Sequence, residues 1–168
     1  ASSGLGTILH LNGELFASRT GVQMLHVPYK GAVPASTDLL GGQVQAMFDS
    51  ISNSAPQVKA GRLRALAVLT PQRSPLMPDV PTATEQGFTG LEFPAWIGLF
   101  APPALPRELA SRIVATLRAV MDEAAMKERF VQSGLIPVFV PEADFVREMA
   151  GHQKMVAELV RTAKIPLQ

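Results

Sequence analysis

Apolar positions in the first part of the chain alternate between helical and strand-like spacing. Helical spacing followed by glycine predicts helices over residues 6–18, 33–40 and 51–60. Short apolar runs between and after them predict strands over residues 22–27, 44–48 and 63–69. The run over 63–69 is almost wholly apolar, so we expect both of its faces to be covered. The alternation is typical of βαβ units and predicts an α/β fold, with a parallel-core sheet flanked by helices.

The regular pattern stops between residues 70 and 90. Prolines at positions 71, 75, 78 and 81 break it there, which indicates a linker or an ordered excursion. Beyond it, the sequence predicts an extended crossing strand over 91–100, helices opened by Pro106 and over 125–133, a strand over 136–140 and a last helix from Pro141 to about Lys164. The chain therefore divides near residue 90 into parts 1–90 and 91–168.

The first predicted helix begins almost at residue 1. Thr7 is a suitable N-cap for this helix, and Gly21 follows its end. The Gly- and Ser-rich stretch before Thr7 resembles a loop that normally follows a strand, yet no strand precedes it. We therefore expect the chain to be truncated ahead of this loop.

Composition narrows the classes of function. Fifteen Lys and Arg residues against fourteen Asp and Glu residues give a net charge of +1, and the basic residues are scattered, so no nucleic-acid partner is expected. The absence of cysteine removes disulfides and thiolate metal sites. His10, His26 and His152 lack the spacing of a zinc site, and no serine lies in a GxSxG motif. We therefore expect no metal, no cofactor and no enzymatic activity.

The strongest local feature is the small-residue stretch over residues 2–7, which we call loop 2–7. It leads into a helix N-terminus, where unpaired backbone N–H groups and the helix dipole favour an anion such as a carboxylate. The loop lacks the lysine of a P-loop, so a nucleotide is not expected. An ordinary N-cap after a flexible end explains the pattern equally well. The candidate ligand-binding residues in the loop are Ser2, Ser3, Gly4, Gly6 and Thr7.

Further candidates follow the predicted strands. Ligands of doubly wound sheets bind outside the carboxyl ends of the strands, and this position is occupied by Tyr29, Lys30 and Gly31 after one strand and by Asp49 after the next. Turn formation or helix capping is the structural alternative for each. His10, one turn into the first helix, either faces the same crevice or is a partly exposed helical histidine.

Taken in order, these segments resemble the Bug family, the solute-binding components of tripartite tricarboxylate transporters. The matching pieces are SGLGT at 3–7 with His10, GELF at 13–16, HVPYKG at 26–31, DLLGGQV at 38–44, MFD at 47–49, GRLRALAV at 61–68, PDVPT at 78–82 and WIGLFAP at 96–102. One departure is that Ile8 and Leu9 stand where the family often has small or hydroxyl residues. Another is that GAVP at 31–34 replaces a more usual GGAP run.

The resemblance implies a two-lobed periplasmic binding protein of type II. Residues 1–90 would form most of the second, ligand-gripping lobe, and residues 91–168 would complete a first lobe whose N-terminal portion is missing. Loop 2–7 and His10 would face the carboxylate of the solute, residues 29–31 would border the cleft, and Asp49 would contact a polar group.

The implied function is extracytoplasmic capture of a small organic acid or amino acid for membrane transporter subunits, in the periplasm. The alternative is a sensing module that signals occupancy to a partner protein. Because the missing residues would leave a face of the second part uncovered, self-association of this chain is also expected.

Overall fold

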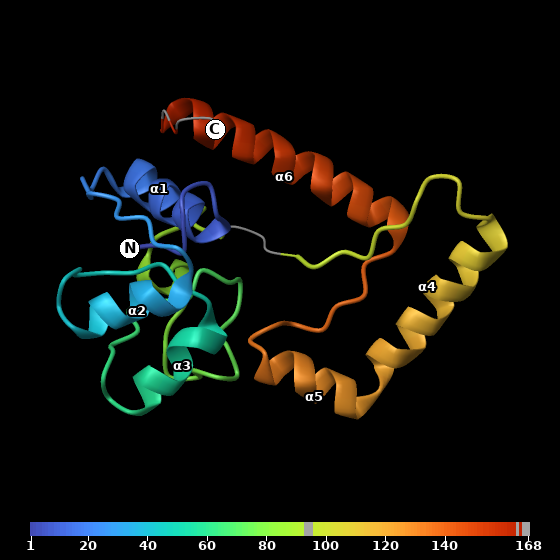
Figure 1. Cartoon of the computed structure of the whole chain (residues 1–168), viewed down its shortest axis with the longest axis horizontal. Coiled ribbons are helices and arrows are strands. Elements are labelled where there is room, and N and C mark those ends of the chain that lie inside the picture. Colours follow the sequence, from blue (N-terminus) through green and yellow to red (C-terminus); the bar gives the residue numbers. More distant parts are fainter. Residues whose placement is uncertain (93–95, 164, 166–168) are drawn as a thin grey trace.

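The computed structural model describes residues 1–92, 96–163 and 165. Its helices are, in chain order, α1 (Ile8–Thr20), α2 (Ala32–Leu40), α3 (Ile51–Lys59), the short 3-10 helix η1 (Thr84–Gln86), α4 (Arg107–Asp122), α5 (Ala124–Gln132) and α6 (Glu142–Thr162). Figure 1 shows α1, α2 and α3 gathered in one half of the molecule and α4 and α5 in the other, with α6 extending from one half to the other.

Each predicted helix is present, with bounds that agree to within a few residues. The Thr7 side chain accepts a hydrogen bond from the His10 N–H, and Gly21 ends α1 in the left-handed conformation, with its own N–H bonded to the Ala17 carbonyl. Pro106 and Pro141 are the N-cap residues of α4 and α6. These local stop and start signals confirm the helical part of the prediction. Lys164, the predicted end of the last helix, lies outside the described residues.

The predicted sheet differs most from the structure. Two isolated parallel bridges, Ser2 with Pro28 and Val68 with Thr82, are the β pairings of the described residues. Residues 22–27, 44–48, 63–69 and 136–140 contain no regular strand, and neither do the described residues of 91–100; residues 93–95 of that segment lie outside the described residues.

The reason for this difference is that backbone pairing is short wherever it occurs. Residues 1–3 bond to residues 27–31 and 48, and Val68 bonds to Pro81 and Ala83, whereas a ladder needs partner backbone along its whole length. The prediction that both faces of 63–69 are covered is wrong. Val68 is 3% exposed, but Leu66, two residues away on the chain, is 67% exposed.

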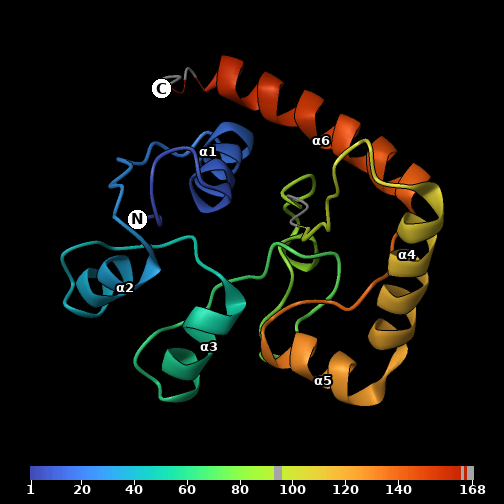
Figure 2. The same ribbon diagram turned by 45° about the vertical axis from the view of Figure 1, so that its right-hand side comes forward.

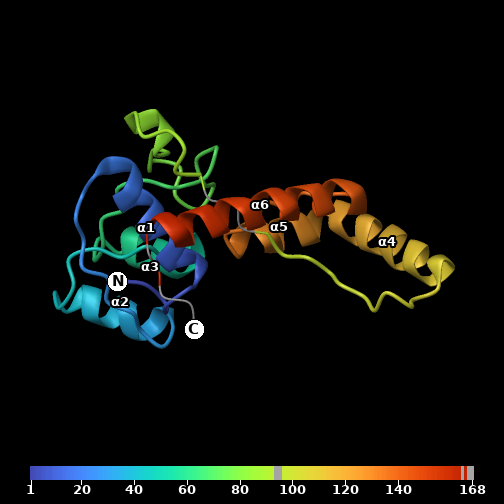
Figure 3. The same ribbon diagram turned by 90° about the horizontal axis from the view of Figure 1, so that it is seen from above.

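The main hydrophobic core joins the two parts of the chain. Leu11 and Leu15 of α1 pack with Leu159 at the end of α6, and Ala83, Leu91 and Ile165 complete this cluster. A second cluster, of Ala55, Val68, Met77 and Val80, lies under α3. Seen from above, α1, α2 and α3 form a compact group beside the C-terminal end of α6, and α4 extends away from it (Figure 3).

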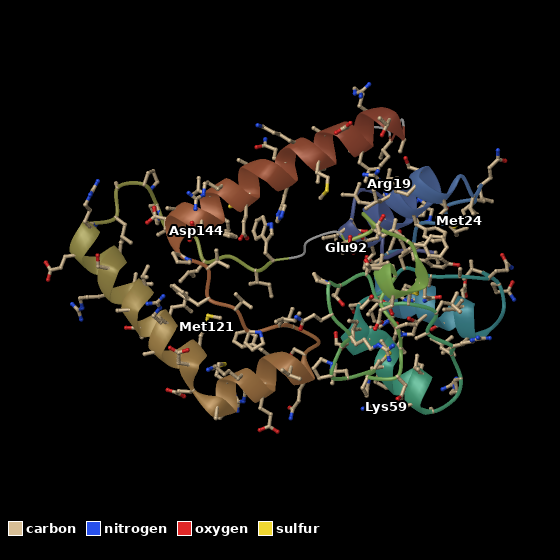
Figure 4. All side chains as sticks on the ribbon, turned by 180° about the vertical axis from the view of Figure 1, so that it is seen from behind. Arg19, Met24, Lys59, Glu92, Met121 and Asp144 are labelled. Carbon is tan, nitrogen blue, oxygen red and sulfur yellow. The ribbon has the colours of Figure 1, made fainter. Side chains whose placement is uncertain are left out.

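Helices α4 and α5 contribute no buried side chain. They form, with α6, an open frame, and the side chain of Met121 on α4 points into the space that the frame encloses (Figure 4). Within this region Trp96 packs edge-on against Phe145 of α6, with ring centroids 4.9 Å apart. The Trp96 Nε1–H also donates to His152 Nδ1 at 2.9 Å, which fixes the segment after residue 95 against α6.

Candidate ligand-binding site

Three segments that are distant in the sequence meet at the start of α1. The Ser2 N–H donates to the Val27 carbonyl, and the Tyr29 N–H donates to the Ser2 carbonyl. On the other side, the Phe48 N–H donates to the Ala1 carbonyl at 3.2 Å. Residues 1–3 therefore lie between 27–31 and 46–48, near the N label among α1, α2 and α3 (Figure 2). Loop 2–7 and residues 29–31 are thus joined by backbone hydrogen bonds, and Asp49 directly follows the residue that is bonded to Ala1.

Loop 2–7 is held by its own hydroxyl groups. The Thr7 hydroxyl donates to the Gly4 carbonyl at 2.8 Å, and the Ser3 hydroxyl donates to Thr7 Oγ1 at 3.4 Å. Gly4 and Gly6 have φ angles of 144° and 72°, which L side chains rarely adopt. A side chain at Gly4 would also approach the Tyr29 carbonyl to 3.3 Å. The two glycines are therefore required by the path of the loop.

Backbone donors remain at the beginning of α1. Among the hydrogen bonds of the described residues, none uses the N–H of Ile8 or Leu9. These are the first two residues of the helix, where the positive end of the dipole lies. The replacement of small residues by Ile8 and Leu9 therefore leaves backbone donors in place, although these two positions supply no side-chain hydroxyl.

Two histidines lie under the loop. His10 is buried, at 4% exposure, and its Nδ1 accepts the Gly6 N–H at 3.1 Å. Its ring stacks on His26, with centroids 4.0 Å apart, and His26 Nε2 lies 2.7 Å from Ser2 Oγ. Burial, His10 and the N-terminal ammonium lower the pKa of His26, in that order of importance. His10 is thus buried beneath the loop, between the Gly6 N–H, the His26 ring and Glu14.

Tyr29, Lys30 and Gly31 each have different surroundings. The Gly31 N–H donates to the Ser3 carbonyl, which ties the turn to loop 2–7. The Tyr29 hydroxyl donates to Asp38 of α2 at 2.8 Å, and this bond raises the pKa of Tyr29. Lys30 is exposed, and it carries a positive charge next to the turn that is tied to the loop.

Asp49 follows the segment 46–48 and precedes α3. Its Oδ2 accepts hydrogen bonds from Asn53 Nδ2 at 2.6 Å and from the Ser54 hydroxyl. Its Oδ1 is buried and has no partner within the described residues. One oxygen of the carboxylate therefore organises the start of α3, and the other is buried without a partner among the described residues.

Sequence reasoning did not select His26, Asn53 or Ser54 for the site. The dipeptide His26-Val27 lay within a recognised motif, but nothing local indicates that its ring stacks on His10, sixteen positions earlier. Asn53 and Ser54 lie in the first turn of α3, four and five residues after Asp49, and their side chains donate to Asp49 Oδ2.

Two concave surfaces lie elsewhere in the molecule. A groove of about 1210 Å³ runs along α6 and is lined mainly by apolar side chains, Trp96 among them. A smaller pocket of about 280 Å³ lies beside Arg19 and Phe88. No group of three His, Asp or Glu residues in the described part of the chain is arranged to hold a metal ion. Helices in the same part are too short or too polar to cross a bilayer.

Solved structures that share this fold include the periplasmic binding protein BugD, which is 32% identical with a TM-score of 0.81, over 99% of this chain and 57% of that chain, and this likeness defines the class. Another, described as a periplasmic transporter, is 34% identical with a TM-score of 0.85, over 99% of this chain and 56% of that chain. An R. palustris protein solved with adipate is 32% identical with a TM-score of 0.82, over 95% and 54%. MatC of Rhodopseudomonas palustris, with bound malate, is 30% identical with a TM-score of 0.71, over 94% and 54%. The α/β fold of this class is thereby confirmed.

The family model described as "Tripartite tricarboxylate transporter family receptor" matches residues 1–164, and the chain belongs to this family. A UPF0065 protein from the tcbD-tcbE intergenic region of a Pseudomonas species is 40% identical over 80% of this chain. BugT of Bordetella pertussis is 35% identical over 82% of it. The chain spans 40% and 42% of the lengths of these two relatives. The resemblance to Bug proteins is confirmed.

Proposed function

We propose that this chain supplies the carboxylate-gripping wall of an extracytoplasmic receptor, which captures a small carboxylated solute for a tripartite tricarboxylate-type transporter. Residues 1–90 form most of the second lobe in this proposal, and residues 91–168 belong to the first lobe. The cleft lies between the two lobes, in the periplasm. Binding occurs without chemical conversion of the solute.

The observation that carries the proposal is the meeting of loop 2–7, residues 29–31 and Asp49 at neighbouring chain segments. The backbone N–H groups of Ile8 and Leu9 point out of the start of α1 without an intrahelical acceptor, and Lys30 adds a positive charge. A carboxylate fits such donors. Malate and adipate, found in two solved relatives, are dicarboxylates and therefore suitable probes.

Asp49 suggests how one solute would be preferred to another. A buried carboxylate oxygen without a partner is costly, and a donor on the ligand would satisfy it. A hydroxyl or an ammonium group supplies such a donor, whereas the methylene chain of adipate does not. On this basis malate is expected to bind more tightly than adipate.

Calorimetric titration of the chain with malate and with adipate tests the proposal. Leu5→Glu places a carboxylate in loop 2–7 and is expected to weaken malate binding about tenfold or more by repulsion. The matched control is Leu25→Glu, which adds the same charge at a position that is 90% exposed. Absence of binding by both dicarboxylates, or equal loss in both variants, would contradict the proposed site.

A further inference from the structure

We infer that the stacked rings of His10 and His26 are positioning residues that hold the two glycines of loop 2–7, so that the loop is ordered before an anion arrives. The inference rests on the proposed function, because it assigns to loop 2–7 the task of receiving the anion. It also assigns to His10 a role different from contact with the solute.

His10 holds Gly6 through a bond that fixes the tautomer of the ring. Its Nδ1 accepts the Gly6 N–H at 3.1 Å, so this nitrogen carries no proton. The ring proton is then on Nε2, which lies 3.4 Å from Glu14 Oε1. An apolar side chain at this position would leave the Gly6 N–H without an acceptor in a part-buried place.

His26 holds Gly4 through Ser2. The Gly4 N–H donates to Ser2 Oγ at 3.3 Å, and Ser2 Oγ is in turn 2.7 Å from His26 Nε2. Ser2 Oγ also lies 3.2 Å from the Gly4 carbonyl oxygen, and Ser2 is 1% exposed, so its hydroxyl is confined to Gly4 and His26. Each imidazole is therefore connected to a different glycine, and both glycines have positive φ angles.

Stacking joins these two connections into one unit. The planes of His10 and His26 differ by 18°, and their centroids are 4.0 Å apart, which restricts the rotation of either ring. The charged groups that face the pair are Glu14, from the same helix as His10, and the N-terminal ammonium, which acts on His26. Because His10 is 4% exposed beneath the loop, it can orient the loop while remaining out of contact with solvent.

Nuclear magnetic resonance on the unliganded chain tests the inference directly. The expected spectrum of His10 shows an unprotonated Nδ1 and a protonated Nε2, and the Gly6 amide is expected to exchange slowly with solvent. A protonated Nδ1 at neutral pH, or a Gly6 amide that exchanges as fast as an unstructured glycine, would overturn the inference. This result needs no variant and no ligand.

Variants then separate positioning from general stability. His10→Leu should speed Gly6 amide exchange about tenfold or more relative to exchange of the Leu15 amide, which lies on α1 with His10. The same variant should weaken malate binding about tenfold. In His10→Asn, the side-chain oxygen can replace Nδ1 as acceptor. This variant should therefore recover most of the slow Gly6 exchange and most of the malate affinity. The inference fails if Asn restores no more than Leu does, or if exchange of Gly6 and of Leu15 rises equally.

His152→Leu is the matched control. It also removes a histidine Nδ1 that accepts a hydrogen bond, in this case from Trp96, and it does so away from loop 2–7. It should leave Gly6 exchange unchanged, and an equal acceleration would contradict the inference. If the unaltered chain binds no malate, the proposed function fails for that solute. The exchange of Gly6 still decides the positioning role, so the two failures are distinguishable.

Discussion

His10 and His26 stack face to face, with ring centroids 4.0 Å apart, although one lies on α1 and the other on the loop before α2. Protonation of both rings would place two positive charges side by side, which is unfavourable at this distance. The pKa of His26 lies below its ordinary value of 6.5. Burial is the largest cause, followed by His10 and then by the N-terminal ammonium. The neutral ring is therefore part of the folded structure.

This shift predicts how stability depends on pH. The unfolded chain binds a proton at His26 more readily than the folded chain does, so the contribution of His26 is complete above pH 6.5 and is lost as pH falls through the lowered pKa. Urea unfolding on both sides of pH 6.5 should show this loss. His26→Gln, which cannot titrate, should reduce it, and an identical pH dependence in that variant would contradict the prediction.

Glu85 predicts a second loss of stability, at lower pH. Its carboxylate accepts from Arg73 Nε and, at 2.7 Å, from the Thr82 N–H, and the Arg73 bond is the main reason that the pKa of Glu85 lies below 4.5. A lowered carboxyl pKa gives stability that is present above pH 4.5 and is lost as pH falls through the folded value. Glu85→Gln should lower Tm at neutral pH and weaken this acid dependence. Glu148→Gln, at an exposed position on α6, should leave both unchanged.

Tyr29 can be observed by itself, because the chain contains one tyrosine. Its hydroxyl donates to Asp38, and loss of that bond on ionisation raises the pKa above 10.0. The associated stability is complete below pH 10.0 and is lost as pH rises through the folded value. Titration of phenolate absorbance should give a midpoint above 10.0, and Asp38→Asn should lower that midpoint. No change in Asp38→Asn would exclude Asp38 as the cause.

The helices could be predicted from the sequence because their signals are local. Thr7, Gly21, Pro106 and Pro141 act within a turn of the helix ends, and each is found at the predicted end. The capping box of Thr82 and Glu85 was also readable from its spacing, but the prolines around it favoured a linker. The strands depend on distant partners, and their apolar runs gave no measure of how far pairing would extend.

The sequence indicated which chain segments carry the candidate site residues, but it did not indicate the contacts that their side chains make. The rule that ligands bind beyond strand ends selected Lys30, Gly31 and Asp49, and backbone hydrogen bonds link the segments that carry them to residues 1–3. The binding roles of these residues stay predictions. The position of His10 inside the protein depends on the stack with His26, which only the folded chain reveals.

Gly98 predicts a packing defect on substitution. A methyl group there would lie 2.6 Å from Phe145 Cζ, so Gly98→Ala must displace the ring that packs edge-on against Trp96. The expected cost is about 1–3 kcal/mol, as in other overpacked sites. Trp96 is the single tryptophan, so its fluorescence reports the change. Gly151→Ala, in open space on α6, should instead stabilise by about 0.5–1 kcal/mol.

Exposed apolar side chains in the second part of the chain predict self-association. Ile97 is 78% exposed, and Ile136 and Val138 are each 62% exposed, so association would remove apolar area from water. Light scattering should show a mean mass that rises with concentration. Ile136→Lys combined with Val138→Lys should reduce this rise, because it removes exposed apolar area and adds repelling charge. Leu25→Lys, which changes an exposed apolar residue outside this region, should leave the rise unchanged. A monodisperse monomer at all concentrations would show that these side chains do not drive association.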